Sequence, residues 1–211
     1  MWRRRFVLAF PLLAVPAGCS LLPSPQTAQI YRLSPQVNDP PGPTIPHSAL
    51  TIELPTASAS LDTDRIALTR GRTRFDYYAS SVWMDRLPVL VQTLMVDAFQ
   101  ADGHIAEVGR DDNGLTRGYL LRTEIRGFEA HYDGLTAGPP EIAIVLELQL
   151  STGPEGRLLG TRLITARAHA SENKLDSVIM AFDSAIGVAL TDSVVWTTRA
   201  ISADRMHRVH R

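Results

Sequence analysis

Two kinds of hydrophobic periodicity follow one another along the chain. Alternation of apolar and polar residues predicts β-strands, and it is clearest at Glu141–Leu150, where every second residue is a large aliphatic one. Apolar residues that recur every three or four positions predict amphipathic helices, first at 87–98 and again at 175–196. Because the helices are few and the strands many, this order predicts helices packed on a sheet.

The remaining predicted strands are shorter or less regular. They are Ala28–Leu33, Ala49–Leu54, Arg65–Thr69, Thr73–Tyr78, 104–108, Tyr119–Tyr132 and Leu158–Ala170. Gly71 lies between two of them and predicts a hairpin, and Gly127 inside the longest predicts a β-bulge. The expected fold class is α/β: a single-domain two-layer sandwich of a mixed, mostly antiparallel sheet with two main helices.

The ends of the first predicted helix carry recognisable signals. Asp85 is a candidate N-cap, and Pro88 fits only in the first turn of a helix. Gly103 is placed to end the helix in a left-handed conformation.

The last predicted helix has weaker boundaries. Ser171 or Asn173 is its candidate cap, and the apolar stripe fades near Trp196. Residues 200–211 are basic and show no period, which predicts a disordered basic tail.

The first nineteen residues resemble an export signal. Three consecutive arginines precede the apolar run Phe6–Val15, and two small residues stand directly before Cys19, the single cysteine. This order resembles the lipobox of bacterial lipoproteins, in which the cysteine is lipidated after cleavage; the lipobox prefers Leu where this chain has Pro16. The alternative is an ordinary signal peptide with an incidental cysteine.

Proline separates the expected domain from this signal. Half of the 14 prolines lie between Pro23 and Pro46, so this region is neither mostly helix nor central strand. We expect a lipoprotein signal peptide at 1–18, a tether at 19–27, one domain at 28–199 and the tail beyond it. The residue directly after Cys19 is Ser20. Lipoproteins that resemble this one and have no Asp at that position are usually sorted to the outer membrane.

Charge and motifs argue against several function classes. The net charge is -1, and removal of 1–18 with its three arginines brings it to about -4, which does not favour nucleic-acid binding. The chain has no nucleophile elbow, dinucleotide-binding, Walker or zinc-protease motif, so we expect no enzyme activity and no cofactor. A periplasmic hydrolase is therefore the poorest hypothesis.

The candidate binding residues are few. Tyr77, Tyr78 and Trp83 are a candidate partner-binding group, with a place in the core as the alternative. Asp62 and Asp64 are interpreted as turn residues. The histidines predict no metal site by their spacing, except for a weak pair in the tail; they are His47, His104, His131, His169, His207 and His210.

Taken in order, several blocks of the chain resemble the ABC-type transport auxiliary lipoproteins, the family of paraquat-inducible protein C. These blocks are IYRL at 30–33, LDTDRIAL at 61–68, YYASSVWMDRLPVLVQTLMVDAF at 77–99, RGFEA at 126–130 and AFDSAIGVALTDSVVW at 181–196. The likeness runs through nearly all of the chain after the signal peptide, and it rests on the order and spacing of the blocks.

The resemblance implies a function that composition does not. Such proteins are lipid-anchored on the periplasmic face of the outer membrane of Gram-negative bacteria and receive a periplasmic protein with mammalian-cell-entry (MCE) domains. That partner works with an ABC permease and ATPase in moving phospholipids or other hydrophobic molecules between membranes. The alternative is a lipoprotein that itself carries acyl chains, in a groove lined by Glu141–Leu150 and the first helix. Antiparallel edges are compatible with a homo-oligomer.

Overall fold

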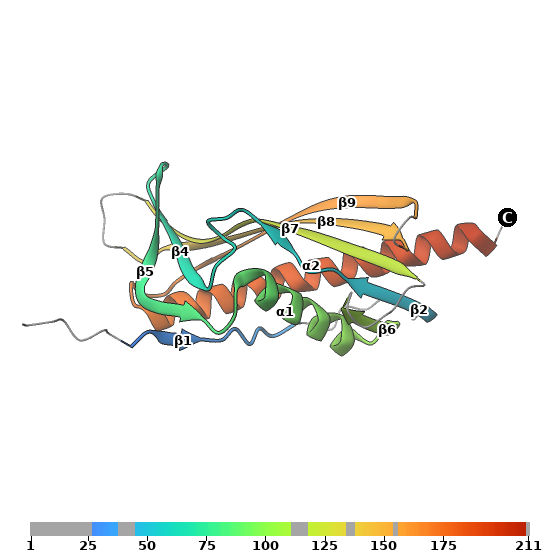
Figure 1. Ribbon diagram of the computed structural model, residues 1–211, viewed down its shortest axis with the longest axis horizontal. Coiled ribbons are helices and arrows are strands. Elements are labelled where there is room, and N and C mark those ends of the chain that lie inside the picture. The colour runs from blue at the N-terminus through green and yellow to red at the C-terminus, as the bar shows by residue number, and fades with distance from the viewer. Residues whose placement is uncertain (1–26, 38–44, 111–117, 134–137, 154–155, 210–211) are drawn as a thin grey trace, which may run out of the picture.

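Figure 1 shows a computed structural model, which describes residues 27–37, 45–110, 118–133, 138–153 and 156–209. Cys19, the signal peptide and most of the tether lie outside these ranges. The elements are β1 (Gln29–Tyr31), β2 (Ile45–Ile52), β3 (Thr56–Ala57), β4 (Arg65–Arg70), β5 (Arg74–Trp83), α1 (Leu87–Asp102), β6 (Ile105–Arg110), β7 (Tyr119–Tyr132), β8 (Glu141–Thr152), β9 (Leu158–His169) and α2 (Leu175–Val209).

The sheet is organised around β7. Along one edge β7 pairs antiparallel with β8, which pairs antiparallel with β9. Its other edge pairs with three short strands in turn, β2, β3 and β4, all parallel to it. Outside these lie β6 on β2 and the β5–β1 pair on β4. The two helices complete a second layer, so the predicted single-domain α/β fold with a mixed sheet is confirmed.

A bulge at Gly127 keeps both halves of β7 in the core. The register against β8 shifts between Ile125 and Gly127, as the sequence predicted. Before the shift the odd-numbered Leu121 and Ile125 are buried, and after it the even-numbered Phe128 and Ala130 are. Because side chains alternate with period two, a strand without the bulge would turn one half of these residues to solvent.

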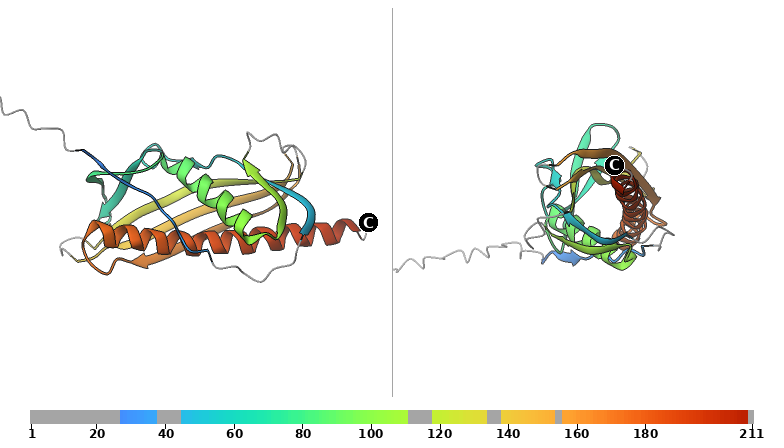
Figure 2. Two further views of the ribbon diagram at one scale, coloured as in Figure 1. Left: turned by 90° about the horizontal axis from the view of Figure 1, so that it is seen from below. Right: turned by 90° about the vertical axis from the view of Figure 1, so that its right-hand side faces the viewer.

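The alternating face of β8 forms the floor of the core. Five of its aliphatic side chains are fully buried: Ile142, Ile144, Leu146, Leu148 and Leu150. α2 packs across β8 and β9, and α1 packs on β6 and β2. Seen along the long axis, the curved sheet and the two helices enclose this core (Figure 2). The β8 face is therefore structural, and it does not line a groove.

Three aromatic rings join the layers. Trp83 at the end of β5 contacts Phe128 and Phe182 edge to face, with ring centroids 6.1 Å and 5.2 Å apart. Phe128 and Phe182 stack at 5.3 Å. These rings bring β5, β7 and α2 together, and their burial contributes a large share of the hydrophobic stabilisation.

The start of α1 differs from the prediction. Arg86, not Asp85, is the N-cap residue, and no side chain caps the helix. The Leu87 N–H instead donates to the Thr63 carbonyl at 2.9 Å, and Arg86 pairs with Asp62, whose carboxylate we had interpreted as a turn acceptor. Pro88 does lie in the first turn, and Gly103 does end the helix with φ 69°.

The predicted disordered tail is wrong over most of its length, because α2 continues to Val209. Ile201 is fully buried and Asp204 is 5% exposed, so two turns beyond Trp196 still pack on the sheet. The inward-facing positions here are partly polar, since Thr197 and Thr198 are also buried. An apolar stripe therefore does not mark them in the sequence.

α2 is long and apolar enough to span a membrane, with a mean hydropathy of 1.7 over its most apolar window. That window is 61% buried, however, and α2 runs along almost the whole molecule against the sheet (Figure 1). Its hydrophobicity is thus accounted for by the core of this domain.

Candidate functional site

The predicted aromatic group does not form an exposed patch. Trp83 is 2% exposed and belongs to the core. Tyr77 is half-buried and donates to the Ser60 carbonyl at 3.0 Å. The hydroxyls of Tyr78 and Tyr132 lie 2.8 Å apart, and burial together with this contact raises the pKa of Tyr78. The group joins neighbouring elements, and Trp83 is not accessible to a partner.

A second feature is the N-terminal strap, residues 29–37, which lies between α1 and α2 (Figure 2). Its first part is β1, parallel to β5, and Leu33 is inserted into the core at 3% exposure. The Ser34 N–H donates to Asp183 of α2 at 2.7 Å. A side-chain carbon at Gly187 would come within 2.9 Å of the Gln36 carbonyl oxygen, so the strap approaches the helix backbone directly.

The strap contacts α2 at two separate points. The Tyr31 hydroxyl donates to Asp176 at 3.3 Å, and the Gln36 carbonyl lies close to Gly187. Both ends of the strap are therefore attached to this helix.

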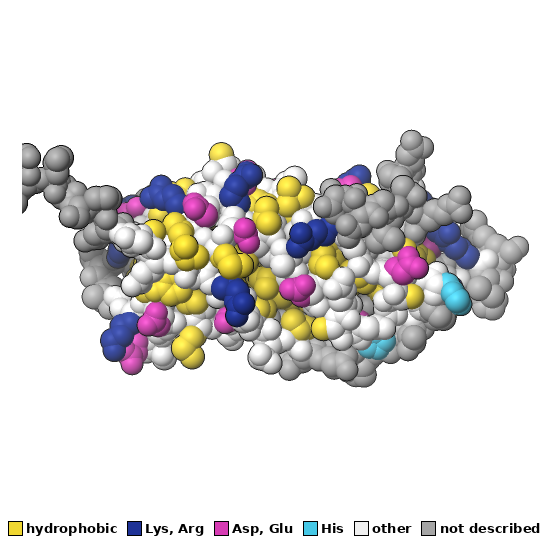
Figure 3. Space-filling model, turned by 60° about the horizontal axis from the view of Figure 1, so that its bottom comes forward, with side chains coloured by type: hydrophobic (Ala, Val, Ile, Leu, Met, Phe, Trp, Pro, Cys, Tyr) yellow, Lys and Arg dark blue, Asp and Glu magenta, His cyan; other side chains and the backbone are white. Residues whose placement is uncertain are grey.

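A groove lies between the strap and α1. Its volume is about 490 Å³, and its lining includes Leu33 and Pro35 of the strap and Leu90, Leu94 and Ala98 of α1. Hydrophobic side chains gather on this face of the molecule (Figure 3). Met84 in the groove lining is 54% exposed, and Ile30 at the start of the strap is 70% exposed. Apolar side chains line much of this groove, with Arg32, Asp85 and Asp97 also in its lining, so it suits an apolar ligand or peptide segment with a polar end.

A second candidate site, built around the buried carboxylate of Asp204, lies near the other end of α2. The Asp204 side chain is 3% exposed, and Arg157 donates to its Oδ1. Tyr119 donates to Oδ2 at 3.1 Å, and Arg208 pairs with the same oxygen at 2.8 Å. A cleft of about 860 Å³ lies beside this cluster, and Arg205 and Glu107 contribute to its lining.

The pKa values of two aspartates on α2 move in opposite directions. Burial would raise the pKa of Asp204, but hydrogen bonds from Tyr119 and Arg157 and the charge of Arg208 outweigh it, so the pKa is lowered. Burial raises the pKa of Asp183, against the opposing hydrogen bond from the Ser34 N–H. The surroundings of Asp204 thus favour its ionised form, whereas burial disfavours the ionised form of Asp183.

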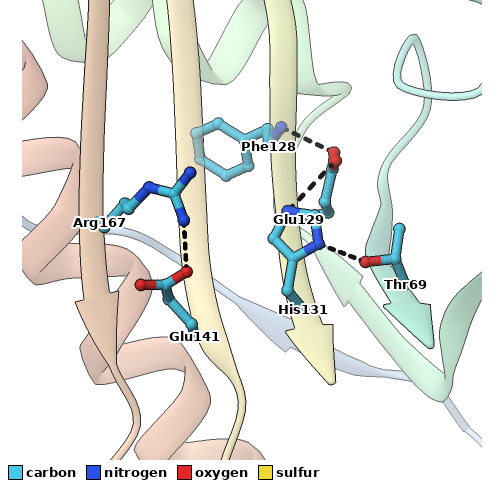
Figure 4. A network of polar contacts seen from close by, with 6 residues as sticks. All are labelled: Thr69, Phe128, Glu129, His131, Glu141 and Arg167. Carbon is cyan, nitrogen blue, oxygen red and sulfur yellow. Dashed lines mark hydrogen bonds and ion pairs between the residues drawn. The ribbon is translucent and has the colours of Figure 1, made fainter. Parts of the chain in front are cut away.

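A third group of polar contacts covers the sheet face that points away from the helices (Figure 4). His131 lies between Thr69 and Glu129, and Arg167 donates to Glu141 at 2.6 Å. These contacts join β4, β7, β8 and β9, and they surround no cavity. Solvent-exposed pairs of this kind contribute at most about 1 kcal/mol each, so they define a solvated surface.

Within the described residues, no three His, Cys, Asp or Glu side chains converge as metal ligands would. His207 lies near the end of α2, while its proposed partner His210 is outside the described ranges. The lipidation residue Cys19 is also outside them.

Comparison with known proteins identifies a family and a fold. The model of the family described as "ABC-type transport auxiliary lipoprotein component" matches residues 31–194. An uncharacterized protein of Bradyrhizobium diazoefficiens is 26% identical over 160 residues, which are 73% of this chain and 40% of that protein. The chain therefore spans less than half of this relative.

Two crystal structures share the fold. A protein of Xanthomonas campestris superposes with a TM-score of 0.78 at 26% identity, covering 85% of this chain and 99% of that one. A second, uncharacterized protein superposes with a TM-score of 0.61 at 15% identity, covering 83% and 99%. The family match runs from Tyr31 to residue 194, so it includes most of the strap and more than half of α2.

Proposed function

Because the chain belongs to the family of ABC-type transport auxiliary lipoprotein components, we propose that it is the lipid-anchored subunit of an MCE/ABC-type intermembrane lipid transport system. In this role it docks the periplasmic MCE-domain protein at the outer membrane. The ABC permease and its ATPase are then partners in the same assembly. The anchor is the lipid on Cys19, and the domain stands on the periplasmic side.

The observation that carries this proposal is the strap. A docking subunit must be attached firmly to its anchor, and the strap joins the chain that follows Cys19 to the sheet and to α2. It does so through β1–β5 pairing, the buried Leu33 and the Ser34–Asp183 hydrogen bond. A domain attached by a loose terminus would need none of these contacts.

Affinity purification tests the proposal. The full-length chain, tagged at its C-terminus, is purified from gently solubilised membranes of its own host. We expect an MCE-domain protein among the proteins retained, together with the permease and ATPase. A membrane lipoprotein of unrelated family with the same tag is the control. Absence of any MCE-domain protein under conditions that preserve other membrane complexes would contradict the proposal.

The strap groove favours a second candidate function, that of a lipoprotein that carries acyl chains itself. About 490 Å³ of largely apolar lining is of the size that ligand pockets have. Native mass spectrometry of the detergent-exchanged protein decides between the two: an added lipid mass beyond that of the Cys19 anchor supports the carrier. A single anchored mass supports docking alone.

A homo-oligomer stays a prediction. In the described part of the chain β9 pairs only with β8, so its other edge has free backbone donors and acceptors. Sedimentation of the solubilised protein over a range of concentrations would report self-association directly.

A further inference from the structure

The hairpin between β4 and β5 concentrates positive charge. The sequence RGRTR places Arg70, Arg72 and Arg74 within five residues, and all three are exposed. Figure 1 shows this hairpin rising from the body of the molecule at the end where α2 begins. We call residues 70–75 the basic hairpin tip.

The charge arrangement of the tip is unfavourable for folding. Arg70 and Arg74 are direct cross-strand partners, and Arg72 lies in the turn between them. Like charges placed opposite each other destabilise a hairpin. The stability of the hairpin therefore does not explain why three arginines lie here, and an external anion would neutralise them.

Two acidic residues lie near the tip. Asp76 follows it in sequence, and its carboxylate accepts the Tyr77 N–H at 2.8 Å. Asp133 is exposed and directly follows Tyr132, which pairs with Arg70. Arg70 lies over the ring of Tyr132 at 4.8 Å, which fixes the base of the tip to β7. Within the described residues, neither Arg72 nor Arg74 forms an ion pair. Two guanidinium groups are thus available to a ligand.

An exposed aromatic side chain accompanies these arginines. Phe75 is 40% exposed, and its ring meets Tyr77 edge to face at 5.3 Å. An apolar ring beside cationic groups is the combination that binds an interface between water and lipid, since the ring enters the acyl boundary while the cations meet phosphate.

The tip lies within reach of the anchored end of the chain. Gln29 pairs with Ser81, which is seven residues after Arg74 on the same strand, so at most about 29 Å separates Gln29 from Arg74. Cys19 precedes Gln29 by ten positions, a reach of up to about 35 Å. A lipid on Cys19 and the hairpin tip are therefore able to meet the same membrane.

We propose that the basic hairpin tip binds anionic phospholipid headgroups of the membrane that holds the Cys19 anchor. The inference rests on the proposed anchoring and adds a second attachment point. Arg72 and Arg74 bind headgroup phosphates, since guanidinium matches two phosphate oxygens at once, and Phe75 inserts at the acyl boundary. Two points of attachment restrict how the domain tilts, so its other end is held toward the periplasmic partner.

To test this proposal, the full-length lipidated protein is reconstituted into vesicles. Thr73→Cys supplies a thiol at the tip for an environment-sensitive fluorophore, because lipid occupies the natural cysteine. Vesicles of phosphatidylcholine alone are compared with vesicles that also contain phosphatidylglycerol, both with a headgroup-nitroxide lipid as quencher. We expect quenching in the anionic vesicles only, and we expect high salt to reverse it.

Matched variants show whether Arg72 and Arg74 cause the quenching. Arg72→Gln with Arg74→Gln lowers the ratio of bound to free tip roughly five-fold for each arginine. Arg162→Gln with Arg199→Gln makes the same charge change at two other exposed arginines and leaves quenching unaltered. The hairpin variant should unfold at the same or a higher temperature than the parent, because it removes a like-charge pair.

Several results would overturn the inference: equal quenching in both vesicle types, no effect of the hairpin variant, or an equal effect of the control. A tip that stays unquenched yet cross-links to an acidic protein would assign it to that protein instead. Failure of the anchor itself is distinguished by mass, since an unlipidated chain carries two labelled thiols, and its tip is then tested by co-sedimentation with the same vesicles.

Discussion

Asp183 and Asp204 both lie on α2, but their charged carboxylates affect the stability of the fold in opposite directions. Asp204 accepts hydrogen bonds from Tyr119 and Arg157, whereas Asp183 accepts one from the backbone N–H of Ser34 in the strap. Sequence reasoning assigned a role to neither. Both positions fall on the inward face of α2, where an aspartate looks like an interruption of the apolar stripe, and only the partners supplied by other elements show what it does.

Asp204→Asn should destabilise the fold by about 2 kcal/mol at neutral pH, because the buried carboxylate's three charge-assisted contacts, with Arg157, Tyr119 and Arg208, are weakened. The folded-state pKa of Asp204 is lowered. Its stabilisation is therefore full above the ordinary pKa of about 4 and is lost as the pH falls through the lowered value. Urea unfolding of parent and variant across acid pH checks this, and a gap that stays constant with pH would contradict it.

Asp183→Asn should leave stability unchanged or raise it by up to about 1 kcal/mol at neutral pH. The asparagine oxygen still accepts the Ser34 N–H, while the cost of burying a charge disappears. Because the folded-state pKa is raised, that cost is present above it and absent below the ordinary pKa. The same urea series measures the difference, and a clear loss of stability would show that the charge of Asp183 contributes favourably.

Among the elements, the regular strands and the first helix were the most predictable. The alternation of β8, the bulge at Gly127 and the helix end at Gly103 follow from local rules of period and backbone conformation. The start of α1 did not, since a backbone carbonyl of Thr63 satisfies its first N–H. A contact of that kind depends on the tertiary fold.

The end of α2 was mispredicted, and its energetics are measurable. Ile201→Ala should cost about 3 kcal/mol, since the side chain is fully buried. Met206→Ala, at a position 62% exposed, should change stability by less than about 0.5 kcal/mol. Chemical unfolding of both variants provides the measurement. If both substitutions had equally small effects, residues 200–209 would not be packed on the domain, and the prediction of a tail would stand.

The strap depends on close approach to α2 at Gly187. Gly187→Leu places atoms where the Gln36 carbonyl now lies, and we expect a loss of about 1–3 kcal/mol with faster proteolysis at the strap. Ser184→Leu adds the same side chain at an exposed position of that helix and is the control. Because leucine favours helix over glycine by about 1 kcal/mol, a destabilised Gly187→Leu variant can only reflect displacement of the strap. Unaltered proteolysis would mean that the strap is not held there.

At the scale of the whole molecule, the ends of α2 have different surroundings. α2 rises about 52 Å over its 35 residues. The strap begins and the basic hairpin tip lies at one end, and the Asp204 cluster with its cleft lies at the other (Figure 1). If it is anchored through Cys19 as we propose, such an elongated domain is suited to join a membrane to a partner.

The sequence predicted the family more readily than the surfaces. The blocks at 61–68, 77–99 and 181–196 are core and helix segments, and core segments keep a family's pattern. Trp83 was proposed for partner binding and is buried. The strap and hairpin tip combine residues distant in sequence, so periodicity within one segment does not reveal them.

We propose that this chain holds an MCE-domain protein at the outer membrane through Cys19. Inner and outer membranes of the host are separated on a density gradient, and the MCE-domain protein is followed in each fraction. With the parent chain, part of it should sediment with the outer membrane. In a strain that carries Cys19→Ser, and in one that lacks the chain, the MCE-domain protein should be absent from the outer-membrane fraction. An MCE-domain protein whose distribution is the same in all three strains would contradict the account.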